Sequence, residues 1–355
     1  MKGFWETLPR PFFVLAPLAN VTDAAFRRVI AKYGKPDITW TEFVSADGLI
    51  KASPEGKAKL MRDLLYTEAE RPIVAQLFTS NPETMEAAAR LCQDLGFDGV
   101  DINMGCPDKT IEKQGAGAKL ITTPERAVEV IRAAKRGADK IPVSVKTRLG
   151  YNKDILEEWL PVLLKEEPAA LTLHARTRKE MSKVPAHWDR VKRAVEIRNE
   201  LGSKTLIIGN GDALDIEDAK KKATESGADG VMLGRAIFGK PWLFRGPSTD
   251  ARKMLREKTV WPDSERHMDA SDTGDPRTFS NEDFSEVKNR LRIAVEHTRL
   301  FEELLGDIKS FAIMKKHFKA YVEGFDGAKE LRIKLMESSS ATEVENIVEE
   351  FLAKE

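Results

Sequence analysis

The first 245 residues alternate between short strand-like runs and longer stretches with helical periodicity, and this alternation limits the possible folds more than any other feature. The predicted strands span 12–16, 38–43, 73–78, 99–104, 142–148, 170–175, 205–209 and 230–235. Several are almost entirely apolar, as parallel strands buried on both faces usually are. Eight strand–helix units in this length match the size and order of an α/β fold, the (β/α)8 TIM barrel. An open doubly wound sheet is the alternative, but no GxGxxG motif follows the first strand.

Capping residues indicate where some of the helices begin and end. Asn81-Pro82 predicts a helix over about 82–95, with Asn81 as the N-cap and Pro82 in the first turn. Asp215 is expected to cap a later helix that stops at Gly227. These signals support helices between the predicted strands.

The pattern changes near residue 246. Residues 246–283 are rich in Pro, Ser, Thr, Asp, Arg and Lys and have a weak hydrophobic pattern, which is typical of a linker or a long excursion. Helical periodicity returns over 284–355. We therefore predict a catalytic barrel domain over 1–245, a linker over 246–283, and a small C-terminal helical domain of three or four helices over 284–355.

Composition excludes several classes of protein. Lys plus Arg and Asp plus Glu both total 57, so the chain has no net charge and is not expected to coat nucleic acid through bulk charge. Two cysteines cannot build a disulfide framework and the scattered histidines form no metal motif, so we expect a cytoplasmic protein without a metal site. No apolar run reaches the length of a membrane span, and the N-terminal segment predicts no signal peptide.

Barrel enzymes carry their chemistry where the strands end, on the loops that follow them. Most of the predicted strand ends here carry side chains that can hold a polar ligand. These candidates are Pro17, Leu18, Ala19, Gln76, Asn103, Cys106, Lys146, Arg148, His174, Arg176, Asn210, Gly211, Asp212, Gly234 and Arg235. Polar residues collect at loop starts in most proteins, so the argument depends on the whole set and not on one position.

The ends of the last two predicted strands are the most specific. Gly-Asn-Gly-Asp at 209–212 and Gly-Arg at 234–235 offer backbone N–H groups on glycine-containing turns, and Arg235 adds a positive charge. Barrels often bind a phosphate at these two strands. The two turns together therefore predict a phosphorylated cofactor.

Three side chains favour a flavin as that cofactor. Lys146 in a pocket needs an acceptor, which the N1–C2=O edge of a flavin supplies, and Gln76 can both donate to and accept from the same ring. His174 would face the ring or the phosphate, or else is a buried core histidine. Cys106 follows a glycine on a loop, where it acts as a nucleophile or as a general acid. Beside a flavin, the proton donor is the simpler interpretation.

Nine stretches of the chain match a known family: APLANVTDAAFRR (16–28), TEFVSADGL (41–49), AQLF (75–78), GFDGVDINMGCPDKTIEKQGAGAKL (96–120), PVSVKTRLG (142–150), LTLHARTR (171–178), IIGNGD (207–212), GADGVMLGRAIFGKPW (227–242) and MKKHFKAYVEGFDGAKELRIKLM (314–336). Through them the chain resembles the bacterial tRNA-dihydrouridine synthases, and the last stretch resembles the helical domain in the version usual for B-type members. Two departures are Asn20, where the family commonly has glycine, and the segment 183–188, which lacks the family's usual ending in Asp-Trp.

The resemblance implies an FMN enzyme that reduces the C5=C6 bond of D-loop uridines in tRNA, with NADPH or NADH as the reductant. It places FMN against Pro17, Leu18, Ala19, Gln76, Lys146, His174, Asn210, Gly211, Asp212, Gly234 and Arg235. Hydride would pass from FMN to C6 of the uracil, and Cys106 would give a proton to C5 from the opposite face. The family's known targets include position 17 and positions 20 or 20a, and the sequence does not choose between them.

The resemblance also implies a tRNA whose target base leaves its stack to enter the site. The residues predicted to contact this RNA are Asn103, Arg148, Arg176, Arg178, Lys315, Lys316 and Lys319. Residues 308–322 contain no acid, and Lys315 and Lys319 share one helical face, as a phosphate-binding stripe needs. We expect the protein to act as a monomer.

Two other functions remain open on the sequence alone. One is an FMN barrel oxidoreductase that acts on a small molecule, such as a dihydroorotate or an enone. The other is an RNA-binding protein that uses the barrel as a scaffold. Bound flavin would exclude the scaffold, and a need for the basic helical tail would exclude the small-molecule enzyme.

Overall fold

The computed structural model describes residues 3–245 and 284–354. The predicted linker over 246–283 lies outside the described residues. Within the described chain, contacts group into two compact units. The first runs to Ile237 and includes Pro241–Phe244, and the second contains Phe238–Lys240, Arg245 and the C-terminal helices.

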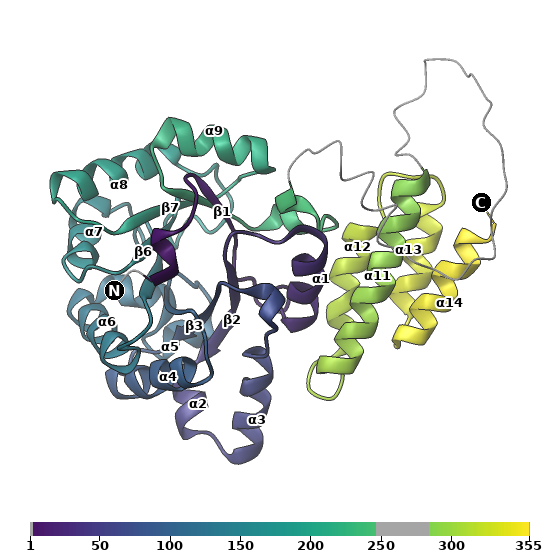
Figure 1. The fold of residues 1–355 in the computed structure, drawn as a ribbon, viewed down its shortest axis with the longest axis horizontal. Coiled ribbons are helices and arrows are strands. Elements are labelled where there is room, and N and C mark those ends of the chain that lie inside the picture. The colour runs from purple at the N-terminus through teal and green to yellow at the C-terminus, as the bar shows by residue number, and fades with distance from the viewer. Residues whose placement is uncertain (1–2, 246–283, 355) are drawn as a thin grey trace. The chain divides into compact units, whose positions relative to one another are not determined.

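Eight parallel strands form the centre of the first unit (Figure 1). They are β1 (Phe12–Leu15), β2 (Thr39–Ser45), β3 (Ile73–Phe78), β4 (Gly99–Met104), β5 (Val143–Arg148), β6 (Ala170–His174), β7 (Leu206–Asn210) and β8 (Gly230–Leu233). From β2 to β8 each strand pairs with the next one in the sequence, and β8 pairs with β1. A single bridge between Val14 and Ile38, the residue before β2, links the two remaining edges. The predicted TIM barrel is therefore confirmed.

Helices lie around the outside of these strands (Figure 1). They are α1 (Ala24–Gly34), α2 (Ala46–Lys51), α3 (Pro54–Asp63), α4 (Pro82–Asp94), α5 (Lys109–Lys113), α6 (Pro124–Gly137), α7 (Leu156–Leu164), α8 (Trp188–Glu200) and α9 (Ile216–Ser226). The predicted caps are present: the Asn81 side chain accepts the Glu83 N–H at 2.9 Å, and that of Asp215 accepts the Asp218 N–H at 2.8 Å. Helix α9 ends at Gly227, whose φ of 71° lies in the left-handed region that glycine adopts most easily.

Apolar residues fill both sides of the strands. The larger core lies between the sheet and the surrounding helices and includes Cys92, which is fully buried as its helical position predicts. A second core gathers the first residues of several strands around Trp5, which belongs to a short N-terminal 3-10 helix. The Trp5 ring lies 5.9 Å from that of Phe12 and 6.0 Å from that of Trp40. This packing fills the N-terminal end of the barrel, so the carboxyl ends of the strands are the ones left to form a site.

The second unit is a helical bundle. It contains α11 (Phe284–Leu305), α12 (Met314–Tyr321), α13 (Ala328–Glu337) and α14 (Ala341–Leu352). Helix α11 packs against α12 and α14, and α13 contacts α12 and α14. Among the helices of both described ranges, none combines the length and the apolar composition needed to cross a bilayer.

Two buried histidines lie in the centre of this bundle. The imidazole rings of His297 on α11 and His317 on α12 have centroids 4.5 Å apart, and the Tyr321 hydroxyl lies 3.4 Å from Nδ1 of His297. Burial lowers the pKa of His317 to about 3, and the charge of Lys316 acts in the same direction. Burial also holds the pKa of His297 well below its ordinary value. Both rings are therefore neutral in the folded bundle at physiological pH.

We expect the bundle to lose stability as the pH falls below about 6.5. An unfolded histidine binds a proton near pH ~6.5, whereas these two stay neutral in the folded state until much lower pH. The unfolded state thus binds more protons, and the free energy of unfolding falls by up to about 1.4 kcal/mol per pH unit for each histidine. Urea denaturation followed by far-ultraviolet circular dichroism at several pH values measures this slope. His317→Leu should reduce it by one histidine's share, and an unchanged slope would contradict the assignment.

Candidate active site

Neighbouring strands bring polar residues into two adjacent rows at the C-terminal end of the barrel. Arg148 of β5 stands opposite His174 of β6, and His174 stands opposite Asn210 of β7. Lys146 lies two residues before Arg148, so both side chains point to the same face of the sheet. Lys146 in turn stands opposite Asn103 of β4. The register alone therefore gathers residues that are up to 107 positions apart in the sequence, from Asn103 to Asn210.

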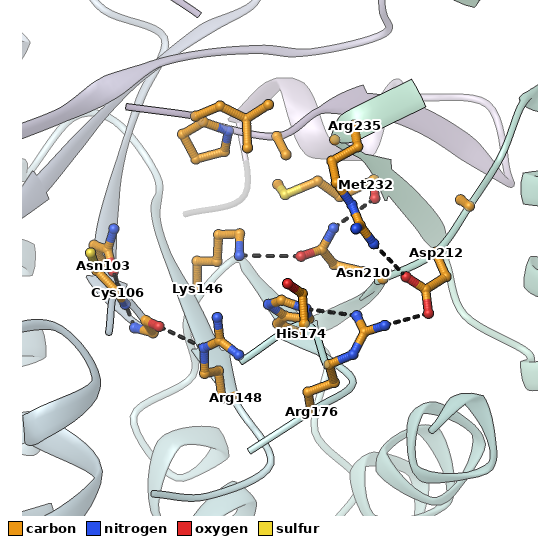
Figure 2. Close-up of a pocket in the computed structure, with 18 of the residues that line it drawn as sticks. Asn103, Cys106, Lys146, Arg148, His174, Arg176, Asn210, Asp212, Met232 and Arg235 are labelled. Carbon is orange, nitrogen blue, oxygen red and sulfur yellow. Dashed lines mark hydrogen bonds and ion pairs between the residues drawn. The ribbon is translucent and has the colours of Figure 1, made fainter. Parts of the chain in front are cut away.

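These side chains line a cavity of about 710 Å³ (Figure 2). This volume lies within the range of small-molecule and cofactor sites. All residues predicted to bind the cofactor line this cavity, as do four others that the sequence singled out: Asn103, Cys106, Arg148 and Arg176. These residues therefore lie around one cavity, and their roles in binding stay predictions.

Backbone contacts on both sides hold Cys106 in place. Its N–H donates to Oδ1 of Asn103 at 2.9 Å, and its carbonyl accepts the N–H of Ala118 at 2.9 Å. Gly117 has a φ of +60°, and a Cβ added there would lie 2.7 Å from the Cys106 carbonyl oxygen. The segment KQGAGA therefore supplies the second support of the Cys106 loop. Burial raises the pKa of the Cys106 thiol.

Two cations stand close to this thiol. Nε of Arg148 donates to the Gly105 carbonyl at 2.7 Å, and its Nη1 contacts two carbonyls of the loop after β6 at 3.2 Å. Burial lowers the pKa of Arg148 to about 10 and that of Lys146 to about 8, so both remain charged at neutral pH. Nζ of Lys146 lies 3.3 Å from Oδ1 of Asn210. The two positive charges oppose the effect of burial on the Cys106 thiol.

A second group of charges surrounds His174 (Figure 2). Nη1 of Arg176 lies 3.3 Å from Nε2 of His174. A guanidinium only donates hydrogen bonds, so Nε2 must accept and the neutral ring carries its proton on Nδ1. Burial, with the charges of Arg148 and Lys146 next, holds the pKa of His174 well below its ordinary value.

Asp212 joins the two arginines at this end of the cavity. Arg176 forms an ion pair with Oδ2 of Asp212, and Nη2 of Arg235 donates to Oδ1 of Asp212 at 2.8 Å. The Asp212 carboxylate also accepts the Ala186 N–H at 2.8 Å. The hydrogen bond from Arg176 lowers the pKa of Asp212, although burial alone would raise it. Asp212 therefore stays ionised and orders this wall of the pocket.

The loop before α8 holds the turn at 209–212, although its sequence departs from the family's usual pattern. Nε1 of Trp188 donates to the Gly211 carbonyl at 2.8 Å. The Trp188 ring also fills the space beside Gly209, where an added Cβ would lie 2.4 Å from it. The Trp188 contacts and the Ala186 hydrogen bond make this loop a direct support of the pocket.

Hydrogen bonds and one left-handed residue fix the loop after β1. Asn20 has a φ of 53°, a left-handed conformation that asparagine adopts more easily than most residues. Its N–H donates to the buried Glu42 carboxylate of β2. The Leu18 N–H donates to Oγ1 of Thr22 at 2.9 Å. Asn20 is thus compatible with a site where the family commonly has glycine. Glu42 is the only charged residue of its strand, and this signal could have identified it.

Four predicted RNA contacts lie outside the cavity lining. Nε of Arg178 donates to Oε1 of Glu112 at 2.7 Å, and its guanidinium lies 5.3 Å from the centroid of the Tyr151 ring. The other three, Lys315, Lys316 and Lys319, belong to α12 of the helical unit. Their roles as RNA contacts stay predictions.

The chemistry of the lining suits a phosphorylated, partly flat ligand such as FMN. Four cations, Lys146, Arg148, Arg176 and Arg235, line the cavity against the single ionised carboxylate of Asp212 among its lining residues. Such an excess of positive charge favours a phosphate. The apolar side chains that follow β1 offer a surface for a ring. In the part of the chain that the structure describes, no group of three His, Cys, Asp or Glu residues is arranged to hold a metal ion.

Comparison with known proteins assigns the family. The family model for dihydrouridine synthase (Dus) matches residues 14–355. The chain is 38% identical to "Probable tRNA-dihydrouridine synthase" of Staphylococcus epidermidis (strain RP62A), over 99% of this chain and 97% of that protein. It is also 38% identical to "Probable tRNA-dihydrouridine synthase 2" of Bacillus subtilis (strain 168), over 99% of this chain and 98% of that one.

Among solved structures, a complex of 2-naphthoyl-CoA reductase has a TM-score of 0.50 at 13% identity, over 66% of this chain and 49% of that one. This likeness supports the barrel fold alone. The family match over nearly the whole chain and the two relatives carry the assignment: this chain belongs to the dihydrouridine synthase family.

Proposed function

We propose that this protein is a tRNA-dihydrouridine synthase that reduces the C5=C6 bond of D-loop uridines, with FMN as its cofactor and NADPH or NADH as the reductant. The observation that carries the proposal is the position of Cys106, which lines the same cavity as Lys146, His174 and Arg235. A proton donor and a cationic cofactor pocket that share one cavity suit the reduction of a polarised double bond. The names of the two relatives support tRNA as the substrate.

The lining residues divide between the parts of the cofactor. Arg235 and the backbone of the turns at Gly211 and Gly234 would hold the phosphate, and Lys146 and Gln76 would face the polar edge of the ring. The remaining predicted cofactor contacts are Pro17, Leu18, Ala19, His174, Asn210 and Asp212. When bound, FMN supplies the hydride that adds to C6 of the uracil ring.

Cys106 supplies the proton. Addition at C6 builds negative charge on the C5–C4=O side of the base, so the reaction needs a proton at C5. The Cys106 S–H bond breaks as the new C5–H bond forms, and the thiolate that remains takes a proton from solvent. Because burial raises its pKa, the thiol is protonated at neutral pH and ready to donate. The nearby charges of Arg148 and Lys146 stabilise the thiolate after the transfer.

RNA recognition would use both units. In this proposal Asn103 and Arg148 contact the extruded base, and Arg176 and Arg178 contact the base or the neighbouring phosphates. The lysines of α12 would bind tRNA phosphates away from the chemistry.

A spectroscopic titration tests the proposal. The protein should be yellow when purified, and NADPH should bleach its flavin absorbance without oxygen. Added tRNA transcript should then restore the colour, because uridine accepts the hydride. If reduced enzyme keeps its reduced spectrum in the presence of unmodified tRNA, the proposed substrate is wrong.

Gly117→Ala should slow dihydrouridine formation by about tenfold or more. The added Cβ would meet the Cys106 carbonyl oxygen at 2.7 Å and push the loop out of position. Gly202→Ala is the matched control, since Gly202 has a φ of +63° and nothing within 4 Å of the added atom. Both variants should lose about 1–2 kcal/mol of stability to the left-handed backbone. Equal turnover in the two variants would exclude a specific role for the Gly117 contact.

A further inference from the structure

A buried carboxylate lies below the Cys106 loop, inside the barrel. Asp101 of β4 is fully buried and stands opposite Gln76 of β3 and Ser144 of β5. Its Oδ2 accepts Nε2 of Gln76 at 2.6 Å, and its Oδ1 accepts the Ser144 hydroxyl at 2.5 Å. Its partners cannot be predicted from the sequence, because the pairing depends on the register of three strands.

These hydrogen bonds continue upward to Cys106. Oε1 of Gln76 accepts Nδ2 of Asn103 at 3.0 Å. Oδ1 of Asn103 then accepts the N–H of Gly105 at 3.1 Å and that of Cys106 at 2.9 Å. One line of hydrogen bonds thus joins Asp101 to the backbone of the reactive cysteine.

The donors and acceptors in this line can be arranged in one order only. An ionised carboxylate accepts and never donates, so the Gln76 amide must turn its NH2 group to Asp101. The Gln76 oxygen then faces Asn103, so the Asn103 NH2 group must donate to it. The Asn103 oxygen then faces the backbone N–H groups of Gly105 and Cys106, and it accepts a hydrogen bond from each. With Asn103 reversed, an NH2 group would meet two further donors.

We propose that Asp101 is a positioning residue that fixes the Cys106 loop by setting the orientation of the Gln76 and Asn103 amides. The importance of this loop for proton delivery rests on the function proposed above, whereas the hydrogen-bond order itself does not. Asp101 does not itself line the cavity, and it acts through Gln76 and Asn103, which do.

The position of this carboxylate is costly for stability, which makes a structural role alone a poor explanation. Burial raises the pKa of Asp101 to about 6, and the hydrogen bonds from Ser144 and Gln76 and the charge of Lys146 oppose that rise. Burying a charged group costs free energy even where hydrogen bonds offset part of that cost, and an apolar side chain of similar size carries no such cost. A residue needed only for packing would therefore gain nothing from the carboxylate.

Alkylation of the purified holoenzyme with iodoacetamide, followed by peptide mass spectrometry, tests the proposal without tRNA. In Asp101→Val the amides lose their fixed orientation, the loop loosens, and Cys106 becomes less buried. Since the thiolate is the reactive form and burial raises the thiol pKa, Cys106 alkylation should be at least about fivefold faster. Dihydrouridine formation should fall by about tenfold or more in the same variant.

Two controls separate positioning from general loosening. Cys92 is fully buried, and burial raises its pKa to about 12, so its alkylation reports on opening of the whole barrel. It should stay slow in every variant that folds. Ser144→Ala removes the other hydrogen bond to Asp101 but leaves the line to Cys106 intact, so its Cys106 alkylation should stay within about twofold of the wild type.

A second pair of variants exchanges the donor and the acceptor between positions 76 and 101. It tests the proposal even if Asp101→Val does not fold. Gln76→Glu sets two carboxylates against each other and should speed Cys106 alkylation. Adding Asp101→Asn supplies an NH2 group to the new carboxylate, whose other oxygen still accepts from Asn103. This double variant should return the alkylation rate toward that of the wild type.

Three results would overturn the proposal. The first is a Cys106 alkylation rate in Asp101→Val that equals that of the wild type. The second is a Ser144→Ala variant whose Cys106 alkylation rises as much as that of Asp101→Val. The third is a double variant whose Cys106 alkylation is no slower than that of Gln76→Glu. The failure of the tRNA reaction is a separate outcome: if no dihydrouridine forms in the wild type while the alkylation pattern holds, the positioning role stands and the proposed function falls.

Discussion

Cys106→Ala should lower the rate of dihydrouridine formation by about 10²–10⁴-fold while the protein keeps its flavin. The side chain lost is the proton donor, and the residues expected to hold the cofactor are untouched. Burial raises the pKa of the Cys106 thiol, so the wild-type group is protonated and no other neutral acid replaces it among the labelled residues in Figure 2. Single-turnover assays with pre-reduced enzyme and tRNA transcript isolate the step concerned.

Cys92→Ala is the matched control for this prediction. Cys92 is buried among apolar residues of the barrel, so its loss should cost some stability but leave turnover unchanged. Bleaching of the flavin by NADPH should be the same in both variants and in the wild type. Turnover by Cys106→Ala within about threefold of the wild type would exclude the acid role.

Reversing the charge of the α12 lysines should weaken tRNA binding by about 100-fold at moderate salt. Helix α12 buries Met314, His317, Phe318 and Tyr321, which lie on one face by their spacing. The lysines lie on the other side of the helix, where Lys316 and Lys319 are exposed and Lys315 is half-buried. In the triple variant Lys315→Glu, Lys316→Glu and Lys319→Glu, the salt dependence of binding should also flatten, since fewer counterions are released.

A second triple variant separates a local stripe from a change in total charge. Lys192→Glu, Lys220→Glu and Lys221→Glu alter the net charge equally, on α8 and α9 of the barrel unit. This control should bind tRNA nearly as well as the wild type in a filter-binding assay. Equal losses in the two triple variants would show that overall charge matters and that α12 carries no site.

The strands and several helix ends were predictable because their causes are local. Several strands are apolar along their length, and the others are short runs rich in β-branched or aromatic residues. These patterns placed all eight strands within about two residues. Asn81 and Asp215 cap their helices with their own side chains, so the signal lies in adjacent residues. The order of strands and helices then limited the fold to a barrel or an open sheet.

The position of the pocket was predictable from the topology, but the hydrogen bonds between its residues were not. Barrel geometry brings the strand ends together whatever their residues are, so Lys146 and His174 could be placed in one site from sequence. The link from Asp101 to Cys106 depends on side-chain directions and on the register of three strands. The signal was an acid that is the only charged residue of its strand, and it marks Glu42 in the same way.

The hydrogen-bond partners that two arginines find on distant loops could not be predicted from the sequence either. Arg178 follows β6 as predicted, yet its guanidinium pairs with Glu112 of α5. The guanidinium of Arg176 donates hydrogen bonds to His174, to Asp212 and to the Val184 carbonyl. The charge of an arginine can be read from a sequence, but which carboxylate or carbonyl it meets depends on how the loops close.

Nucleoside mass spectrometry of a tRNA transcript treated with the purified holoenzyme and NADPH tests the central claim most directly. The account predicts a mass gain of about 2 Da, two hydrogens, at a D-loop uridine, formed by the wild type and nearly absent with Cys106→Ala. A flavin that NADPH bleaches in a protein that leaves every uridine of the transcript unchanged would contradict it.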